Sequence, residues 1–452
     1  MRGRFRRALF LCIVAHSSVL RADAVPTYDL KTCIQTALAT SPDLAAAAAE
    51  LAGARAKLSQ AEAGRYGEAE YTQLLGMVNG ARGNAVKSDT NKNDFFTNLG
   101  AFTRFDLMLN IPLWTFGKLD AALRAAQDGI ESQSANTERH RAEVVFNIKQ
   151  LYYSLLLTRQ LSSLLHDMQD NMNKAVKQAE ERLGSNSTGV SEIDVLKLKV
   201  GRSKFAKGVY EVDAAMELTR AALARAIGVA ATPEFDIADR KLEPVGANID
   251  PIETYLAEAP PKRPEARQLE TGIAAQAAKV DLEEAGYYPN FFLSTGLQFA
   301  RAGNRTEQRS PFASDEFNYV RPVGVLGVRW DLNFFTTSAK VDEARADLQR
   351  LQAVQRDATT GLQLEIRKSY SDLLQARGTM AAADDGRKAG RGLLILSVSN
   401  FDLGIGEAED LFKGLGMYTE SSTDYMRAVH DYNVAVAALS KAVGRELTKL
   451  EY

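Results

Sequence analysis

The sequence predicts a mainly α-helical fold with a membrane β-barrel, to which each chain contributes four β-strands. Three observations predict it. The chain contains two tandem copies of one unit, each copy has a pair of segments with a period of two, and each pair is followed by a helical pattern of unusual length. Each copy is therefore expected to supply one β-hairpin and one long antiparallel helical hairpin.

The duplication is clearest in the C-terminal part of each copy. The segment Ser399–Gly444 is matched by a degraded copy at Ser187–Gly228, and each combines a glycine turn, an acidic residue and a helical pattern that ends at glycine. Matching positions are 222 residues apart at Pro42 and Pro264, and 215 residues apart at the glycine turns 189 and 404. The sequence therefore predicts two tandem structural repeats.

Composition limits the class of protein. Residues 1–24 have the pattern of a secretory signal peptide, with arginines before an apolar run and an Ala22-Asp23-Ala24 cleavage site; a buried N-terminal helix is the less favoured alternative. Removal of this segment leaves 50 basic and 56 acidic side chains, and a mildly acidic exported protein is a poor nucleic-acid binder. Cys33 would then be the only cysteine, so no disulfide is expected within the chain.

The first copy begins with an Ala-rich helical region from Asp29 to about Gly64, after which the period changes to two. Odd positions between Phe95 and Leu113 are mostly apolar and even positions are mostly polar, which predicts a strand with one oily and one polar face. Its partner is expected at Glu68–Val78. In the second copy the corresponding strands are expected at 291–299 and 320–332, joined by a polar connection.

Each hairpin is followed by a helical pattern of exceptional length. The segment from Lys118 to about Arg182 contains no proline, and its apolar residues keep the spacing of a helix seam. About 65 residues at a rise of 1.5 Å make a rod of roughly 100 Å. A single helix cannot bury its seam, so these helices need neighbours. Beyond the signal there is no apolar run of 18 residues, and no membrane-spanning helix is expected.

These patterns divide the chain into a signal peptide, two repeats, a linker and a tail. Six of the twelve prolines lie between the copies, so the linker is expected to be extended, with at most a short helix near Ile252–Glu258. The expected units are 1–24 (signal peptide), 25–228 (first repeat: hairpin about 67–114, long helix 118–182, helix 190–228), 229–263 (linker), 264–445 (second repeat: hairpin about 289–334, long helix 339–400, helix 407–444) and 446–452 (tail).

Four strands cannot close into a barrel within one chain. An open strand edge leaves unpaired backbone groups that cost several kcal/mol each in hydrocarbon, so lipid-exposed sheet must form a closed barrel. Two chains would give a barrel of about eight strands filled by side chains, whereas three would give about twelve and leave room for a passage. The sequence therefore predicts a homotrimer in contact with outer-membrane lipid.

The order helix, hairpin, long helix, glycine turn and helix, given twice after a signal peptide, resembles the TolC family of bacterial outer-membrane efflux proteins. The resemblance spans about residues 28–445. It is most specific in FDLGIGEAEDL (401–411), YMRAVHDYNVAVAALSKAVG (425–444) and LNIPLWTFGKLDAAL (109–123). The segment WDLNFFTTSAK (330–340) departs from the usual Pro-Leu-Phe and Gly-Gly turn, which puts the local strand-to-helix geometry in doubt.

The resemblance implies a homotrimeric channel-tunnel: a twelve-stranded barrel in the cell outer membrane, continued by an α-helical tunnel (α-barrel) across the periplasm. The implied function is the exit duct of a tripartite efflux or type I secretion system, with an inner-membrane transporter and a periplasmic adaptor protein as partners. The transporter selects the cargo in such systems, so drugs, metal ions and polypeptides all stay open as substrates. No cofactor is expected.

The resemblance also assigns roles to the tips of the long hairpins. The tips are expected to dock the adaptor and to narrow the channel entrance. The candidate adaptor-contacting residues are Arg182, Leu183, Gly184, Gly189, Leu403, Gly404, Ile405 and Gly406.

Asp194 and Asp410 match the positions of acidic residues that line the closed entrance in the family. Rings of identical carboxylates around a three-fold axis would repel one another and attract cations, which makes opening sensitive to pH or metal ions. The alternative is that each aspartate only caps a helix or favours its dipole. Where the family often has a further acid this chain has Lys413, which would make the entrance less negative.

The tryptophans and histidines give weaker indications of function. Trp114 and Trp330, at strand ends, could be membrane-interface aromatics or ordinary packing residues. His140, His166 and His430 lie in helical patterns without metal-ligand spacing, and no nucleophile motif is present, so neither an enzyme nor a metal site is expected. A periplasmic or surface coiled-coil scaffold is the alternative from another class, and the lipid-facing alternation of the four strands argues against it.

Overall fold

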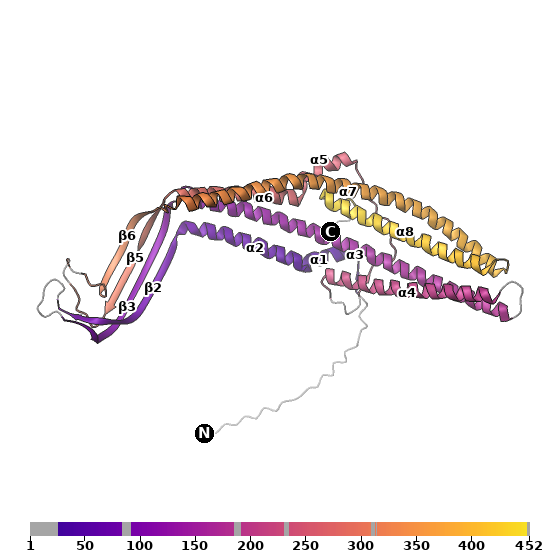
Figure 1. Cartoon of the computed structure of the whole chain (residues 1–452), viewed down its shortest axis with the longest axis horizontal. Helices are drawn as coiled ribbons and strands as arrows, with labels where there is room; N and C mark the ends of the chain where they lie inside the picture. The colour runs from indigo at the N-terminus through magenta and orange to yellow at the C-terminus, as the bar shows by residue number, and fades with distance from the viewer. Residues whose placement is uncertain are drawn as a thin grey trace, which may run out of the picture.

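The protein is an elongated body with its strands at one end and long helices along the rest of its length (Figure 1). This computed structural model describes residues 26–83, 92–184, 191–229, 235–308, 312 and 314–449. The expected signal peptide at residues 1–24 lies outside the described residues, as does the end of the tail at 450–452.

From α2 in the first copy and α6 in the second, both copies build the same series of elements. The first consists of α1 Leu30–Thr40, α2 Pro42–Ala63, β2 Glu68–Arg82, β3 Lys92–Trp114, α3 Lys118–Gly184 and α4 Glu192–Ala226. The second consists of α6 Pro264–Glu284, β5 Asn290–Ala302, β6 Tyr319–Arg329, α7 Phe334–Asp402 and α8 Ala408–Val443. Short 3-10 turns, η1 Gly64–Tyr66 and η2 Ala285–Tyr287, lead from a helix into the first strand of each hairpin. This order confirms the predicted tandem repeat.

The four long strands form one antiparallel sheet in the order β2-β3-β5-β6. The register aligns four residues on what we call the polar face, namely Thr72, Asp106, Gln298 and Arg321. It also aligns Tyr71, Leu107, Leu297 and Pro322 on the opposite, oily face. The alternation predicted separately for each hairpin therefore combines into a single sheet with one apolar side.

The oily face is open to the surroundings. Leu75 and Leu326 on this face are 76% and 78% exposed, although both are large apolar side chains. Within the described residues the outer edges of β2 and β6 pair with no other strand. A water-soluble sheet would cover such a face, because buried apolar area contributes about 25 cal/mol per Å².

A β-bulge interrupts the sheet near the helices. The register between β3 and β5 shifts between Pro112 and Trp114, so Leu113 has no partner in β5 and Trp114 aligns with Phe291 on the oily face. Proline has no backbone N–H to donate to the ladder, which explains why the pairing breaks at this point.

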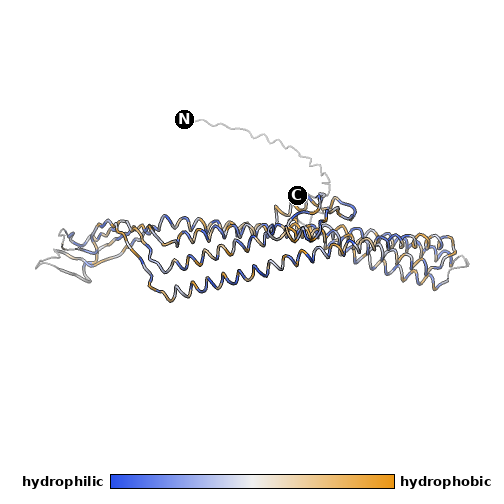
Figure 2. Tube along the Cα trace, turned by 90° about the horizontal axis from the view of Figure 1, so that it is seen from above, coloured by the Kyte–Doolittle hydropathy of each residue, from blue (hydrophilic) through white to orange (hydrophobic). Residues whose placement is uncertain are grey.

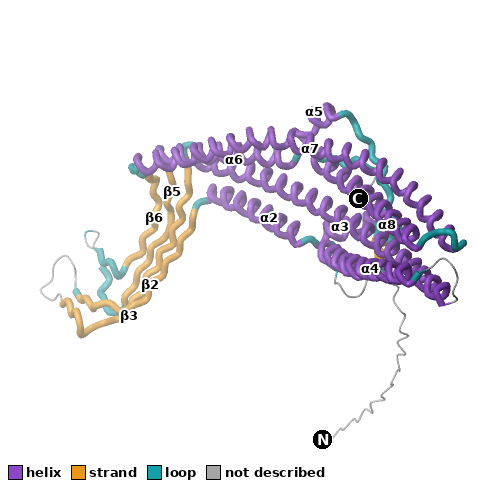
Figure 3. Tube along the Cα trace, turned by 45° about the vertical axis from the view of Figure 1, so that its right-hand side comes forward, coloured by secondary structure: helices purple, strands orange, loops and turns teal. Residues whose placement is uncertain are grey.

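The helices form a wall of four rows. Near the sheet, α3 packs against α2 and α6, and at the far end it packs against α4 and α8. The long helix α7 packs first on α6 and then on α8, as Figure 3 shows. Two rows are thus single helices of about 100 Å, and the other two are each made of two shorter helices end to end.

None of the described helices is both long and apolar enough to cross a membrane. Hydrophilic and hydrophobic residues are interspersed along the long helices, as the hydropathy colouring in Figure 2 shows.

The segment between the two copies wraps the middle of the helical wall. β4 Asp236–Ile237 pairs in parallel with β1 Thr27–Tyr28, and α5 covers Ile252–Lys262. This helix is longer than the short one expected near Ile252–Glu258. Tyr255 on α5 is 1% exposed and packs in a cluster with α7 and α8, and this tertiary burial favours the longer helix.

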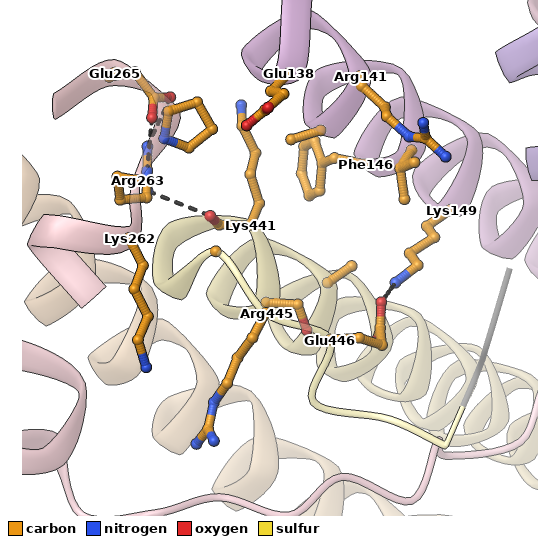
Figure 4. A pocket seen from close by; sticks show the side chains of 16 residues that line it. Glu138, Arg141, Phe146, Lys149, Lys262, Arg263, Glu265, Lys441, Arg445 and Glu446 are labelled. Atoms are coloured by element: carbon orange, nitrogen blue, oxygen red, sulfur yellow. Dashed lines mark hydrogen bonds and ion pairs between the residues drawn. The ribbon is translucent and has the colours of Figure 1, made fainter. Parts of the chain in front are cut away.

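Arg263 joins the end of α8 to the start of α6 (Figure 4). Its side chain is 4% exposed, forms ion pairs with Glu265 and Glu365, and donates to the carbonyl of Ala442 at 2.7 Å and of Lys441 at 3.3 Å. It therefore satisfies carbonyls that the last turn of a helix leaves unpaired. A cavity of about 300 Å³ lies beside this joint, against α3.

The end of the second hairpin differs from the prediction. β6 ends at Arg329, so Trp330 lies outside the strand, and α7 begins at Phe334 rather than near residue 339. The indole of Trp330 donates to the carbonyl of Tyr287 at 3.0 Å and packs edge-on against Phe334. These contacts start the helix early, although the Thr-Thr-Ser that follows has modest helix propensity.

Candidate functional site at the helical tips

The two helical hairpins end side by side at the end of the molecule farthest from the sheet (Figure 1). One tip lies between the end of α3 and the start of α4, and the other between the end of α7 and the start of α8. Residues 185–190, which include the candidate Gly189, lie outside the described residues. The geometry of the tips is therefore described from the helix ends and from the second tip.

The second tip is a tight turn made by glycine. Gly404 has φ of 74°, in the left-handed region, and the amide of Gly406 donates to the carbonyl of Asn400 at 2.9 Å. A Cβ on Gly406 would lie 3.0 Å from backbone atoms of Asn400 and Phe401, so only glycine fits without a shift. The turn presents Leu403 and Ile405 outward, 74% and 76% exposed.

Arg182 ties the first tip to the second. Its guanidinium donates to the carbonyls of Phe401 and Asp402 at 2.7 and 3.0 Å, and it lies over the ring of Phe401 at 5.0 Å. Phe401 itself is 1% exposed. A cation at the C-terminus of α7 also favours the dipole of that helix. Arg182 was predicted to contact an adaptor, and the structure places it in a contact between the two hairpins.

A second link joins α4 to α8 close to the tips. Lys197 lies 3.0 Å from Glu409, and Glu409 also pairs with Lys413 at 2.8 Å on its own helix. Hydrogen bonds from these two ammonium groups lower the pKa of Glu409 to about 2. Lys413 therefore neutralises Glu409. It also stands at a position where the family that the sequence resembles often has an acid.

Close packing supports both links. A Cβ on Gly201 of α4 would lie 2.7 Å from the ring of Phe412 on α8, so the absence of a side chain lets the two helices approach. Beneath them a buried cluster joins all four helices and includes Met172, Leu198 and Leu411. The tips are therefore held together by apolar burial as well as by charge.

The two predicted entrance aspartates have different surroundings. Asp194 accepts hydrogen bonds from the backbone N–H and the hydroxyl of Ser191, at 3.0 and 2.6 Å, and forms a capping box at the start of α4. The hydrogen bond from the Ser191 side chain is the main cause that lowers the pKa of Asp194. Asp410 lies exposed in the first turn of α8. A capping role is thus visible for Asp194.

The groove between α4 and α8 is apolar and open. Ile193, Leu196 and Val200 lie on one side of α4 and are 64%, 56% and 58% exposed. With Phe412 they line a cavity of about 500 Å³ near the tip. Contiguous exposed apolar patches often mark interaction surfaces.

Aromatic side chains gather at the other end, where the strands meet the helices. Trp114 and Trp330 are 62% and 52% exposed. Phe116 stacks on Tyr288 at 5.2 Å, and Trp114 packs edge-on against Phe116. The two tryptophans are predicted from the sequence, whereas their aromatic neighbours are not, because the fold brings these together from both copies.

The three histidines among the described residues lie apart from one another in the helical wall. His140 faces Glu143, His166 faces Asp213 and His430 faces Asp431. Over the ranges that the structure describes, no group of three or more His, Cys, Asp or Glu is placed to hold a metal ion.

Comparison with known proteins agrees with this architecture. The sequence model of the family described as "Outer membrane efflux protein" matches residues 33–192. Protein CyaE of Bordetella pertussis is 25% identical over 368 residues, which cover 80% of this chain and 72% of that protein.

Solved structures share the fold over nearly the whole chain. The outer-membrane channel OprN has a TM-score of 0.74 at 17% identity and covers 92% of this chain and 89% of its own. The Campylobacter jejuni outer-membrane channel CmeC has a TM-score of 0.73 at 14% identity and covers 100% of this chain and 96% of its own.

The sheet with one oily face, the long helical hairpins and these matches define an outer-membrane channel protein with a helical tunnel, which is not an enzyme. The resemblance to the TolC family of outer-membrane efflux proteins is confirmed, and the protein lies in the outer membrane and extends into the periplasm.

Proposed function

We propose that three copies of the chain form the exit duct of a tripartite efflux or type I secretion system. In this assembly β6 of one copy pairs with β2 of the next, and three sheets close into a twelve-stranded barrel. An inner-membrane transporter supplies the energy and acts through a periplasmic adaptor. The duct itself is passive.

The observation that carries the proposal is the sheet. It has an apolar, exposed face and two unpaired outer edges within the described residues. In hydrocarbon each unpaired backbone group costs several kcal/mol, so both edges need partners. Identical neighbours supply them, because β2 and β6 are the two ends of the same four-strand order and a cyclic assembly joins one to the other.

The helical tips are the proposed adaptor contact. Leu183, Leu403 and Ile405 are exposed apolar residues at the far end of the wall. Gly184 and Gly404 flank them, and a Cβ on either would meet nothing within 4 Å, which leaves room for a close approach by another protein.

The same tips are the proposed gate. In a trimer Asp410 would recur around the axis, where its exposed carboxylate would attract cations and resist closure by repulsion. Arg182 and the Lys197–Glu409 pair would oppose that repulsion, because they hold the hairpins of each copy together. Asp194 would contribute less, since Ser191 already holds its carboxylate.

Trp114 and Trp330 are proposed to mark the inner boundary of the membrane. Both are more than half exposed at the helical end of the sheet, where aromatic rings prefer the interface between hydrocarbon and water.

Purified protein in detergent tests the proposal. We expect trimers that resist heat in gel electrophoresis, and ion conduction after insertion into planar bilayers. A coiled-coil scaffold would instead stay in the aqueous phase on detergent partitioning and would not conduct. Monomers without conductance would refute the duct.

A further inference from the structure

The connection between β5 and β6 folds back over the polar face of the sheet. Asn304 donates from its side-chain amide to the carbonyls of Val78 and Asn98, at 3.1 and 2.7 Å. Phe317, at the other end of the connection, packs edge-on against Phe102 at 5.3 Å. Phe102 lies on the polar face of β3, as Asp106 does.

A buried ion pair gives this connection a fixed shape. Arg305 contacts both carboxylate oxygens of Asp315, at 3.1 and 3.0 Å, and the two side chains are 14% and 6% exposed. Arg305 also donates to the carbonyl of Asn79 on β2 and lies 4.7 Å from the ring of Phe317. Breaking one partner of such a pair is costly, because it leaves a charge buried without compensation.

The first hairpin provides the surface on which this connection rests. A Cβ on Gly100 of β3 would lie 2.2 Å from the side chain of Asn304, so glycine leaves the space that Asn304 fills. The amide of Thr306 donates to the carbonyl of Ala81 at 2.9 Å, which continues the contact along β2. The two copies of the repeat are thus joined at the end of the sheet that is farthest from the helices (Figure 1).

We propose that residues 303–308 and 315–318, here called the mouth segment, narrow the extracellular opening of the duct and limit the size of solutes that enter it from outside. The inference rests on the proposed barrel, in which the oily face meets lipid and the polar face lines the passage. Contacts on the polar face then place the mouth segment inside the opening.

The test measures access to a thiol behind the mouth segment. Glu70 lies on the polar face of β2, one row nearer the helices than Asp106, and Glu70→Cys places a thiol there. Native Cys33 gives little background, because it is fully buried and burial raises its pKa to about 12. Whole cells are treated with a small maleimide and with a maleimide that carries a long polyethylene glycol chain.

We expect the small reagent to label Glu70→Cys and the large one to label it slowly. Adding Asn304→Ala and Arg305→Ala removes the hydrogen bonds that hold the mouth segment on β2 and β3, so labelling by the large reagent should rise at least about tenfold. Glu307→Ala, an exposed residue of the same segment, is the matched control and should change nothing.

A second variant changes β3, on which the mouth segment rests, instead of the mouth segment itself. Gly100→Val puts a β-branched residue, which suits a strand, into β3 and displaces Asn304 without changing the sequence of the mouth segment. It should raise labelling by the large reagent as the double variant does. If the large reagent labels all variants equally, and these variants form heat-resistant, conducting trimers, the proposed role of the mouth segment is wrong and the proposed duct still holds. Loss of trimers in the parent would overturn the duct itself.

Discussion

The contact made by Arg182 predicts how firmly the proposed entrance at the helical tips is held closed. Its hydrogen bonds to the carbonyls of Phe401 and Asp402, at 2.7 and 3.0 Å, come from a charged group, and such bonds contribute about 1.5–3 kcal/mol each when buried. Arg182 is only partly buried, so we take about 2–3 kcal/mol for the whole contact. Arg182→Ala should therefore favour separation of the two hairpins by about 30- to 150-fold in each copy.

Single-channel recording in planar bilayers measures this effect. Arg182→Ala should show higher mean conductance and longer open periods than the native protein, because the tips separate more often. Lys177→Ala is the matched control, since Lys177 lies on the same helix, is 78% exposed and pairs only weakly, at 4.0 Å, with Glu181. Arg182→Lys should be intermediate, because an ammonium group cannot make the paired contact of a guanidinium. Native conductance in Arg182→Ala would refute the reasoning.

Further predictions concern charge, pH and the joint between α8 and α6. Asp410→Ala should raise single-channel conductance and weaken block by divalent cations; unchanged block would remove its gating role. The pKa of Glu409 is lowered to about 2 from 4.5, so its link to Lys197 is fully present above pH 4.5 and is lost as the pH falls towards 2. The link should therefore not change between pH 7 and 5, and any change in conductance over that range should be the same in the native protein and in Glu409→Gln. At pH 7 Glu409→Gln should conduct more than the native protein. Arg263→Ala should destabilise the fold by about 3–5 kcal/mol, because it leaves two carboxylates unpaired, and a calorimetric transition as high as the native one would contradict this.

Much of this architecture could be predicted from the sequence, because it depends on periodicity. The period of two predicts which residues lie on each face of the hairpins. The absence of proline predicts α3 and α7 nearly to their ends. The bulge beside Pro112 could not be predicted from alternation, since it depends on which residue of β5 lies opposite. Trp114 reaches the oily face only because of that bulge.

The candidate site was harder to predict, because its contacts join residues far apart in the chain. Arg182 and Phe401 are 219 positions apart, and Lys197 and Glu409 are 212 apart. No local pattern distinguishes these charges from those of an ordinary solvated helix. The capping box of Ser191 and Asp194 was the exception, since its spacing of three residues is a sequence signal.

The outer edges of β2 and β6, which pair with no other strand in the part of the chain that the structure describes, also bear on how the protein reaches its membrane. A lone chain that entered lipid would expose two rows of unpaired amide and carbonyl groups to hydrocarbon. The free-energy cost of several kcal/mol per group would prevent a single chain from inserting. Docking of subunits and entry into the bilayer must then occur as one event. The rate of insertion should accordingly fall far more steeply on dilution than that of a barrel folded from a single polypeptide.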